Sequence, residues 1–164
     1  MDSTSAMPES AARVARLLRE LGHDKPVVML PSTGKSSAEA AAELGCDVAE
    51  IAKSIVFRRL QDDAAVMVIA SGADRIDEAK VAALVGAVGK ADARFVKDKI
   101  GYAIGGVCPI GHLQESVVLI DGQLLRYASV WAAAGHPHAV FNLTPAQLQA
   151  MTGAPTVDVR QNPA

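Results

Sequence analysis

The chain contains few cysteines, few aromatic residues and almost no net charge. Its two cysteines, Cys46 and Cys108, are too few for a disulfide framework, so we expect a reducing, cytoplasmic environment. Aromatic residues make up only 4% of the sequence, and a core must therefore be built from Ala, Val, Leu and Ile. The formal net charge of −2 gives no overall attraction to a polyanion, which would have to bind a local basic patch.

Long apolar runs are also absent. A membrane-spanning helix needs roughly 20 apolar residues, which no stretch of this chain approaches, so no membrane partner is expected. The N-terminus lacks a basic segment followed by an apolar one, and no signal peptide is predicted. The length of 164 residues indicates one domain. We expect residues 1–24 to form a tail and a helix of this domain, and residues 25–164 to form its main part.

Helical and strand patterns alternate along the sequence without an internal repeat. Apolar spacing and capping residues predict helices at residues 9–21, 38–44, 75–85 and 91–99 and from 145 onward. Apolar runs predict strands at residues 26–30, 52–60, 65–70, 117–120, 123–127, 139–143 and 156–159. Asp121-Gly122 predicts a hairpin turn. The fold class is therefore α/β of the α+β type, with a mixed, mostly antiparallel sheet or a partly closed barrel surrounded by helices.

The most informative segment is residues 101–112, GYAIGGVCPIGH. It holds glycine at positions 101, 105, 106 and 111. Glycine permits backbone angles that other residues avoid and lets a ligand approach the main chain closely. Such a loop can aim several backbone N–H groups at one point, where they would hold an oxyanion or a carbonyl oxygen. A tight structural turn between two buried strands is the alternative.

Residues 31–36, PSTGKS, are similar to the end of a phosphate-binding loop that opens a helix. The first glycine of that motif would stand at position 29, where this chain has Met29. A capped helix start, with Ser36 or Ser37 as the cap, is the better interpretation, although that helix start could still face a ligand.

The histidines and Cys108 suggest two further kinds of site. His112, His136 and His138 could bind a metal, but no cysteine or carboxylate is spaced with them in a recognised pattern, so we predict no metal. Cys108 could be a nucleophilic thiol with His112 or His136 as its base. A small buried core residue is the alternative interpretation of Cys108.

Lys53 stands near the start of an apolar strand. A lysine there either extends its ammonium group along the strand edge into water or forms a fixed cation at the mouth of a pocket. Other basic residues follow in the same strand or precede the glycine-rich segment: Arg58, Arg59, Lys90, Arg94, Lys97 and Lys99. Together with Lys53 they would form one basic rim.

In their order along the chain, these segments resemble the YbaK/ProX family, the aminoacyl-tRNA-editing domains related to the insertion domain of bacterial prolyl-tRNA synthetase. The resemblance rests on AAAELG at 40–45, IAKSIVF at 51–57, GGVCP at 105–109, IDGQ at 120–123, AGHP at 134–137 and VFNLTPAQL at 140–148. It extends from about residue 25 to the end of the sequence.

The resemblance implies a freestanding trans-editing deacylase that hydrolyses the ester between a wrong amino acid and the terminal adenosine of a tRNA, tRNA-Pro being one candidate. The implied catalytic residues are Lys53, Gly105, Gly106 and Pro109. The implied substrate-binding residues are Ser36, Ile104, Val107, Cys108, Gly135 and His136. Lys53 would help hold the tRNA end. The glycine loop, Gly105 to Pro109, would present main-chain groups to the reacting carbonyl. Such an ester needs orientation and oxyanion stabilisation, so no cofactor is expected.

The resemblance leaves the edited amino acid, the oligomeric state and an aminoacyl-tRNA synthetase partner open. Val140 stands where the cysteinyl-editing branch carries an acidic residue, so specificity for cysteine is not implied. A non-catalytic tRNA- or synthetase-binding regulator of the same fold is the alternative function, and an unrelated thiol or metal hydrolase is the third.

Overall fold

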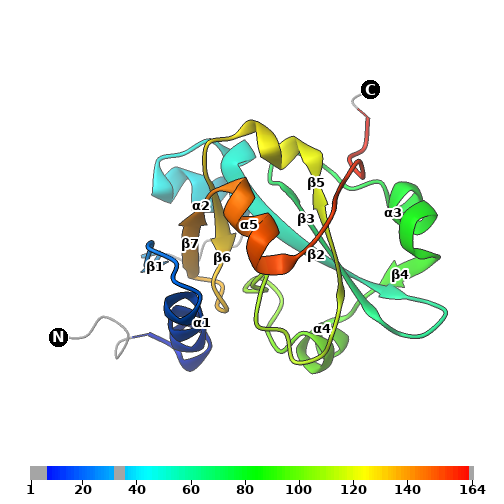
Figure 1. The fold of residues 1–164 in the computed structure, drawn as a ribbon, viewed down its shortest axis with the longest axis horizontal. Coiled ribbons are helices and arrows are strands. Elements are labelled where there is room, and N and C mark those ends of the chain that lie inside the picture. The colour runs from blue at the N-terminus through cyan, green and yellow to red at the C-terminus, as the bar shows by residue number, and fades with distance from the viewer. Residues whose placement is uncertain (1–6, 32–35, 163–164) are drawn as a thin grey trace.

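A mixed sheet is the framework of the fold, which the computed structural model describes through residues 7–31 and 36–162. Within these residues it has eight strands (Figure 1). Seven lie in one row, in the order β1 (Val27–Met29), β7 (Ala139–Leu143), β6 (Val130–Ala133), β2 (Ile51–Arg59), β3 (Ala65–Ser71), β5 (Val117–Asp121) and β8 (Thr156–Val157). The eighth, β4 (Val88–Lys90), pairs with β2 beside this row.

Strand pairing confirms the predicted mixed sheet. The pairs β1–β7, β6–β7, β2–β3 and β2–β4 are antiparallel, whereas β2–β6, β3–β5 and β5–β8 are parallel. The row begins at β1 and ends at β8 without joining, so the sheet is open and is not a closed barrel. The long hairpin of β2 and β3, predicted from two apolar runs around a polar break, forms its centre.

Helices lie around the sheet (Figure 1). They are α1 (Glu9–Glu20), α2 (Ser37–Leu44), α3 (Glu78–Val85), α4 (Ala93–Lys99) and α5 (Pro145–Thr152). Ser36 confirms the predicted cap of α2, because its Oγ accepts a hydrogen bond from the Glu39 N–H at 3.1 Å. No helix in the described parts of the chain has the length and apolar character to span a membrane.

The predicted hairpin at Asp121-Gly122 is wrong. The Asp121 carboxylate is buried, and it accepts hydrogen bonds from the N–H groups of Gln123 at 2.9 Å and Val159 at 3.0 Å. It thereby caps a short 3-10 helix, Gly122–Arg126, in place of the predicted strand 123–127. The next strand is β6, which the sequence did not predict.

Two predicted helices are shorter than expected. The helix predicted at 75–85 begins only at Glu78, because the Asp77 side chain accepts from the N–H groups of Ala79 and Lys80. The segment predicted as helix 91–99 is helical only from Ala93, where Asp92 is the cap, and strand β4 lies just before it.

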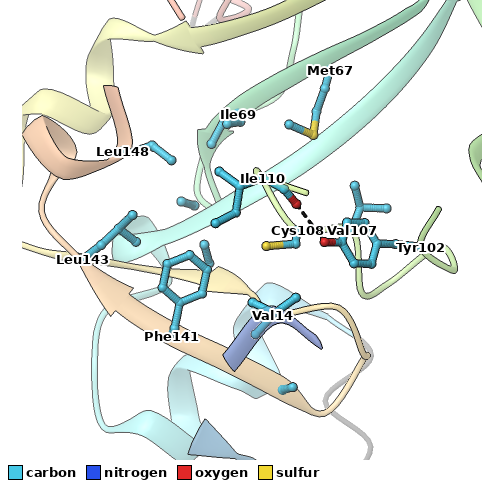
Figure 2. Packing of buried hydrophobic residues seen from close by; sticks show 14 of the residues in the cluster. Val14, Met67, Ile69, Tyr102, Val107, Cys108, Ile110, Phe141, Leu143 and Leu148 are labelled. Atoms are coloured by element: carbon cyan, nitrogen blue, oxygen red, sulfur yellow. Dashed lines mark hydrogen bonds between the residues drawn. The ribbon is translucent and has the colours of Figure 1, made fainter. Parts of the chain in front are cut away.

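The main hydrophobic core lies against one face of the sheet and includes residues of α1, α5 and the glycine-rich segment. Figure 2 shows Val14, Met67, Phe141, Leu143 and Leu148 around Cys108 and Ile110. The segment 101–112 is thus anchored in the core by its aliphatic residues.

Candidate functional site

A cavity of about 190 Å³ opens beside β2. Its walls come from α2, β2, β6, β7, the glycine loop and the turn before β7. The described lining residues are mostly apolar, with Lys53 and three serines among them: Leu30, Ser36, Ser37, Ala40, Ile51, Ala52, Lys53, Ser54, Gly105, Val107, Trp131, Ala132, Ala133, Pro137, Ala139 and Val140. It therefore gathers two of the sequence-predicted motifs, the lysine of β2 and the glycine loop.

The cavity lies where β2 changes partners. One edge of β2 pairs with β3 along residues 52–58, whereas the other edge pairs with β6 only at Ile51 and Ala52 and with β4 only from Phe57. Residues 53–56 have no strand partner on that second edge within the described chain. Because β6 and β4 leave this gap, the glycine loop can approach β2 there.

Two residues of the glycine loop that line the cavity have backbone N–H groups without an acceptor among the described residues. The Gly106 N–H donates to the Ala103 carbonyl at 3.0 Å and closes a turn. Among the described residues, the N–H groups of Gly105 and Val107 have no acceptor, and both residues line the cavity. Gly105 has φ +95°, a conformation that favours glycine. These two donors, one within the turn and one just after it, could hold a carbonyl oxygen or an oxyanion.

Gly106 packs against the neighbouring turn and does not line the cavity. A Cβ at this position would lie 2.7 Å from backbone atoms of His136. Gly135 also lies close to a neighbouring backbone, since a Cβ there would lie 2.6 Å from the Ser10 carbonyl oxygen of α1. Gly106 thus packs on the backbone of His136, Gly135 packs on the backbone of Ser10, and Pro137 of the same turn lines the cavity.

A second set of contacts holds the far end of the loop. The Tyr102 hydroxyl donates to the Ile110 carbonyl at 2.7 Å (Figure 2). The Arg13 guanidinium of α1 donates to the Gly111 carbonyl and lies 5.0 Å from the centre of the Tyr102 ring. These contacts fix both ends of the loop, so its free amides are preorganised.

His112 also braces the loop. Its Nε2 lies 2.9 Å from the Cys108 carbonyl and its Nδ1 lies 2.7 Å from the Ser116 hydroxyl. A carbonyl only accepts, so Nε2 carries the proton and Nδ1 accepts from Ser116 in the neutral ring. Burial, as the largest effect, and the charge of Arg13 lower the pKa of His112, whereas the hydrogen bond to Cys108 raises it.

We predict that acidification destabilises the protein through His112. Its pKa in the folded state lies below that in the unfolded chain, about 6.5. The stabilisation is therefore fully present above pH 6.5 and is lost as the pH falls from there through the folded pKa, because the unfolded chain takes up the proton first. Melting temperatures between pH 8 and pH 5 should show this loss, and His112→Gln should show less of it. An equal pH dependence in both proteins would contradict the assignment.

Lys53 lines the same cavity as Gly105 and Val107. Its Nζ donates to the backbone carbonyl of Asp74. Burial lowers the pKa of Lys53 most, the carboxylate of Asp74 raises it, and the guanidinium of Arg75 lowers it again. An ammonium group has three donors, and two remain for a ligand in the cavity. Lys53 is therefore placed to bind an anionic or carbonyl oxygen.

The other predicted basic residues are largely engaged elsewhere. Arg58 pairs with Asp63 at 3.3 Å, and Arg59 pairs with Asp62 at 2.8 Å. Arg94 lies 3.8 Å from Asp98. Lys90 and Lys97 are exposed. Of the predicted lysines, Lys90 lies on β4, and Lys97 and Lys99 lie on α4.

The remaining predicted site residues lie at different depths. Ser36 is exposed at the cavity edge, where its hydroxyl caps α2. Ile104 is 56% exposed and lines an adjoining hollow. Cys108 and Pro109 are buried and do not line the cavity. The cavity is also lined by residues that the sequence analysis did not select, among them Ser54, Trp131, Ala133 and Pro137. Of these, Ser54 could have been selected because it directly follows Lys53 in the sequence.

The Cys108 thiol is a core group in this structure. Cys108 is fully buried, and this burial raises the pKa of its thiol to about 12. A thiol with this pKa is protonated at neutral pH and is a poor nucleophile. Within residues 7–31 and 36–162, no three His, Cys, Asp or Glu side chains gather as metal ligands would. The segment 31–36, which is similar to the end of a phosphate-binding loop, includes residues 32–35, and these lie outside the described residues.

Comparison with protein-family models matches residues 31–151 to the aminoacyl-tRNA editing domain. A curated relative, the uncharacterized protein YwhH of Bacillus subtilis (strain 168), is 33% identical over 118 residues, which make up 71% of this chain and 74% of that protein.

Two solved structures share the fold over nearly the whole chain. One, described as a "putative trans-editing enzyme for prolyl tRNA synthetase", is 38% identical with a TM-score of 0.90, over 96% of this chain and all of its own. The other, hypothetical protein APE2540, is 27% identical with a TM-score of 0.83, over 91% of this chain and 99% of its own.

Proposed function

Since the chain belongs to the aminoacyl-tRNA editing domain family, we propose that it is a freestanding trans-editing deacylase that hydrolyses the ester of a mischarged tRNA. The single observation that supports this most is that one cavity is lined by Lys53 and by Gly105 and Val107, whose N–H groups have no acceptor among the described residues. The neighbour described as acting for prolyl-tRNA synthetase makes mischarged tRNA-Pro the first substrate to test. We place this activity in the cytoplasm.

In the proposed reaction the free amides bind the ester carbonyl. The N–H groups of Gly105 and Val107 donate to its oxygen and stabilise the negative charge that develops there. A water molecule attacks the carbonyl carbon, and the bond from this carbon to the ribose oxygen breaks. The proton of the water passes to the departing ribose oxygen, with the vicinal ribose hydroxyl as the relay. The products are the free amino acid and the uncharged tRNA.

Lys53 binds the tRNA end in this proposal. Its ammonium group, anchored to the Asp74 carbonyl, donates its remaining N–H groups to an oxygen of the terminal nucleotide. The ester is thereby held against the glycine loop, and holding reactants in place supplies much of the rate enhancement in such reactions.

Two alternatives stay open to experiment. A non-catalytic regulator of the same fold would bind tRNA or a synthetase without hydrolysis, and the free amide pair beside Lys53 favours the enzyme over it. A thiol hydrolase is disfavoured because Cys108 is fully buried with a raised pKa.

The proposal is tested with a panel of tRNAs carrying correct and incorrect amino acids, tRNA-Pro included. We expect at least one mischarged tRNA to be deacylated far faster than without protein, in the presence of EDTA and equally in Cys108→Ala. The measurement is the loss of labelled aminoacyl-tRNA with time. Binding of tRNA without faster hydrolysis would favour the regulator. Activity lost with EDTA and restored by zinc would support the metal hydrolase, and activity lost in folded Cys108→Ala would support the thiol hydrolase.

A further inference from the structure

Ser54 carries a buried hydroxyl group without a partner. Its Oγ is closed off from solvent and makes no hydrogen bond with any described residue. Buried polar groups are almost always hydrogen-bonded, because an unpaired one costs free energy. An exception beside a candidate active site is the expected signature of a group that finds its partner in a ligand.

Ser54 lies at the junction of two hollows. It lines the cavity of about 190 Å³ described above and also a second hollow of about 230 Å³. Gly105 and Val107 are the other residues that both hollows share. The remaining walls of the second hollow are aliphatic: Ile55, Val56, Ala91, Val96 and Ile104. The second hollow is thus suited to an apolar group, and the Ser54 hydroxyl is the one polar side-chain group among its described lining residues.

We infer one placement of an aminoacyl ester across the two hollows. With the ester carbonyl on the amides of Gly105 and Val107 and the ribose toward Lys53, the amino-acid side chain extends into the aliphatic hollow. Its α-carbon then lies at the junction of the two hollows, beside Ser54. The hydrogen-bond donor that every aminoacyl ester carries on this carbon is the α-ammonium group.

Resting on the deacylase function above, we propose that Ser54 Oγ accepts a hydrogen bond from the substrate's α-ammonium group, and that the second hollow takes a small aliphatic side chain. For this contact the serine side chain would rotate between staggered rotamers and bring Oγ to the ligand. The unpaired edge of β2 supplies further acceptors, because alternate residues of 53–56 direct their carbonyls away from β3. Ser54 would thus position the ester, and the reaction itself would use the amides.

The test compares two substrates that differ only in the amino group. Alanyl-tRNA and valyl-tRNA are paired with propionyl-tRNA and isovaleryl-tRNA, which keep the side chain and lack the α-ammonium. Ser54→Ala should lower kcat/KM by about 10- to 100-fold for the aminoacyl members, as expected for a lost hydrogen bond to a charged group. The same change should leave the des-amino members almost unaffected.

Stability separates this role from a structural one. Removing an unpaired buried hydroxyl should leave the melting temperature of Ser54→Ala unchanged or raised. Ser129→Ala, which removes a hydroxyl outside both hollows, is the matched control. It should leave kcat/KM unchanged for both substrate classes. Should Ser54→Ala fold poorly, Ser54→Cys provides the same comparison, because its thiol is a weak acceptor of similar size.

The outcomes distinguish this proposal from the one on which it rests. Equal losses on both substrate classes would place the hydroxyl against the ester or ribose and overturn the assignment. Hydrolysis of aminoacyl-tRNA by Ser54→Ala at the wild-type rate would also overturn the assignment. In that case the activity of the wild-type protein would still support the deacylase function. A wild-type protein that hydrolyses no charged tRNA would overturn both.

Discussion

Replacement of Gly106 by alanine is expected to lower single-turnover deacylation by about 10²- to 10³-fold, the loss typical of a misplaced oxyanion donor. The added Cβ would lie 2.7 Å from the backbone of His136, which has no flexible side-chain end to move aside. The turn closed by Gly106 would therefore shift, and the amides of Gly105 and Val107 would shift with it. The measurement is single-turnover hydrolysis of the best substrate in the panel.

Gly122→Ala is the matched control for Gly106→Ala. A Cβ at Gly122 would meet only the Val157 carbonyl oxygen, at 3.8 Å, so this substitution should leave turnover unchanged. Overpacking at Gly106 should also cost about 1–3 kcal/mol of stability, measured by thermal melting monitored with circular dichroism. A Gly106→Ala protein that melts much lower yet turns over normally while folded would show that the loop has only a structural role.

Replacement of Lys53 by alanine is expected to reduce deacylation by about 10- to 100-fold, because a charge-assisted contact with the tRNA end is worth about 1.5–3 kcal/mol. Its folded structure should persist, since the ammonium group makes a single hydrogen bond, to the Asp74 carbonyl, among the described residues. The loss should appear mainly in KM if Lys53 binds substrate and transition state equally. Steady-state kinetics and a tRNA-binding titration measure it.

Two control variants isolate the charge of Lys53. Lys53→Met keeps an unbranched apolar stem without the ammonium group and should lose as much activity as Lys53→Ala. Lys97→Ala removes an exposed lysine of α4 and should retain nearly all activity. If Lys53→Ala deacylates at the wild-type rate, Lys53 is an ordinary strand-edge residue.

Local sequence signals predicted the elements that local interactions stabilise. The β2–β3 hairpin followed from two apolar runs, and the start of α2 followed from the serine cap. The hairpin predicted at Asp121-Gly122 is wrong because the Asp121 carboxylate is buried and accepts a hydrogen bond from the N–H of Val159, 38 residues away. Strand β6 was missed because it has only four residues and depends on pairing with β7 and β2. Such long-range contacts leave no pattern in a single segment.

The sequence predicted only some of the residues that line the cavity. Lys53, Gly105, Val107 and Ser36 do line one cavity, as their residue types suggested. Which glycine faces the cavity depends on the backbone of a turn 30 residues later, and sequence spacing does not report that contact. The unpartnered hydroxyl of Ser54 was equally hidden, because a serine in a strand is ordinary until its surroundings are known.

The gap along β2 also bears on strand pairing with other chains. Unpaired strand edges invite pairing with foreign strands and so promote aggregation. Here the open stretch covers only residues 53–56 and is bounded by β6 on one side and β4 on the other. A strand of about five or six residues, the usual length, would find too few partners there. This stretch can therefore offer backbone groups to a small ligand, while the neighbouring strands limit its pairing with a foreign strand.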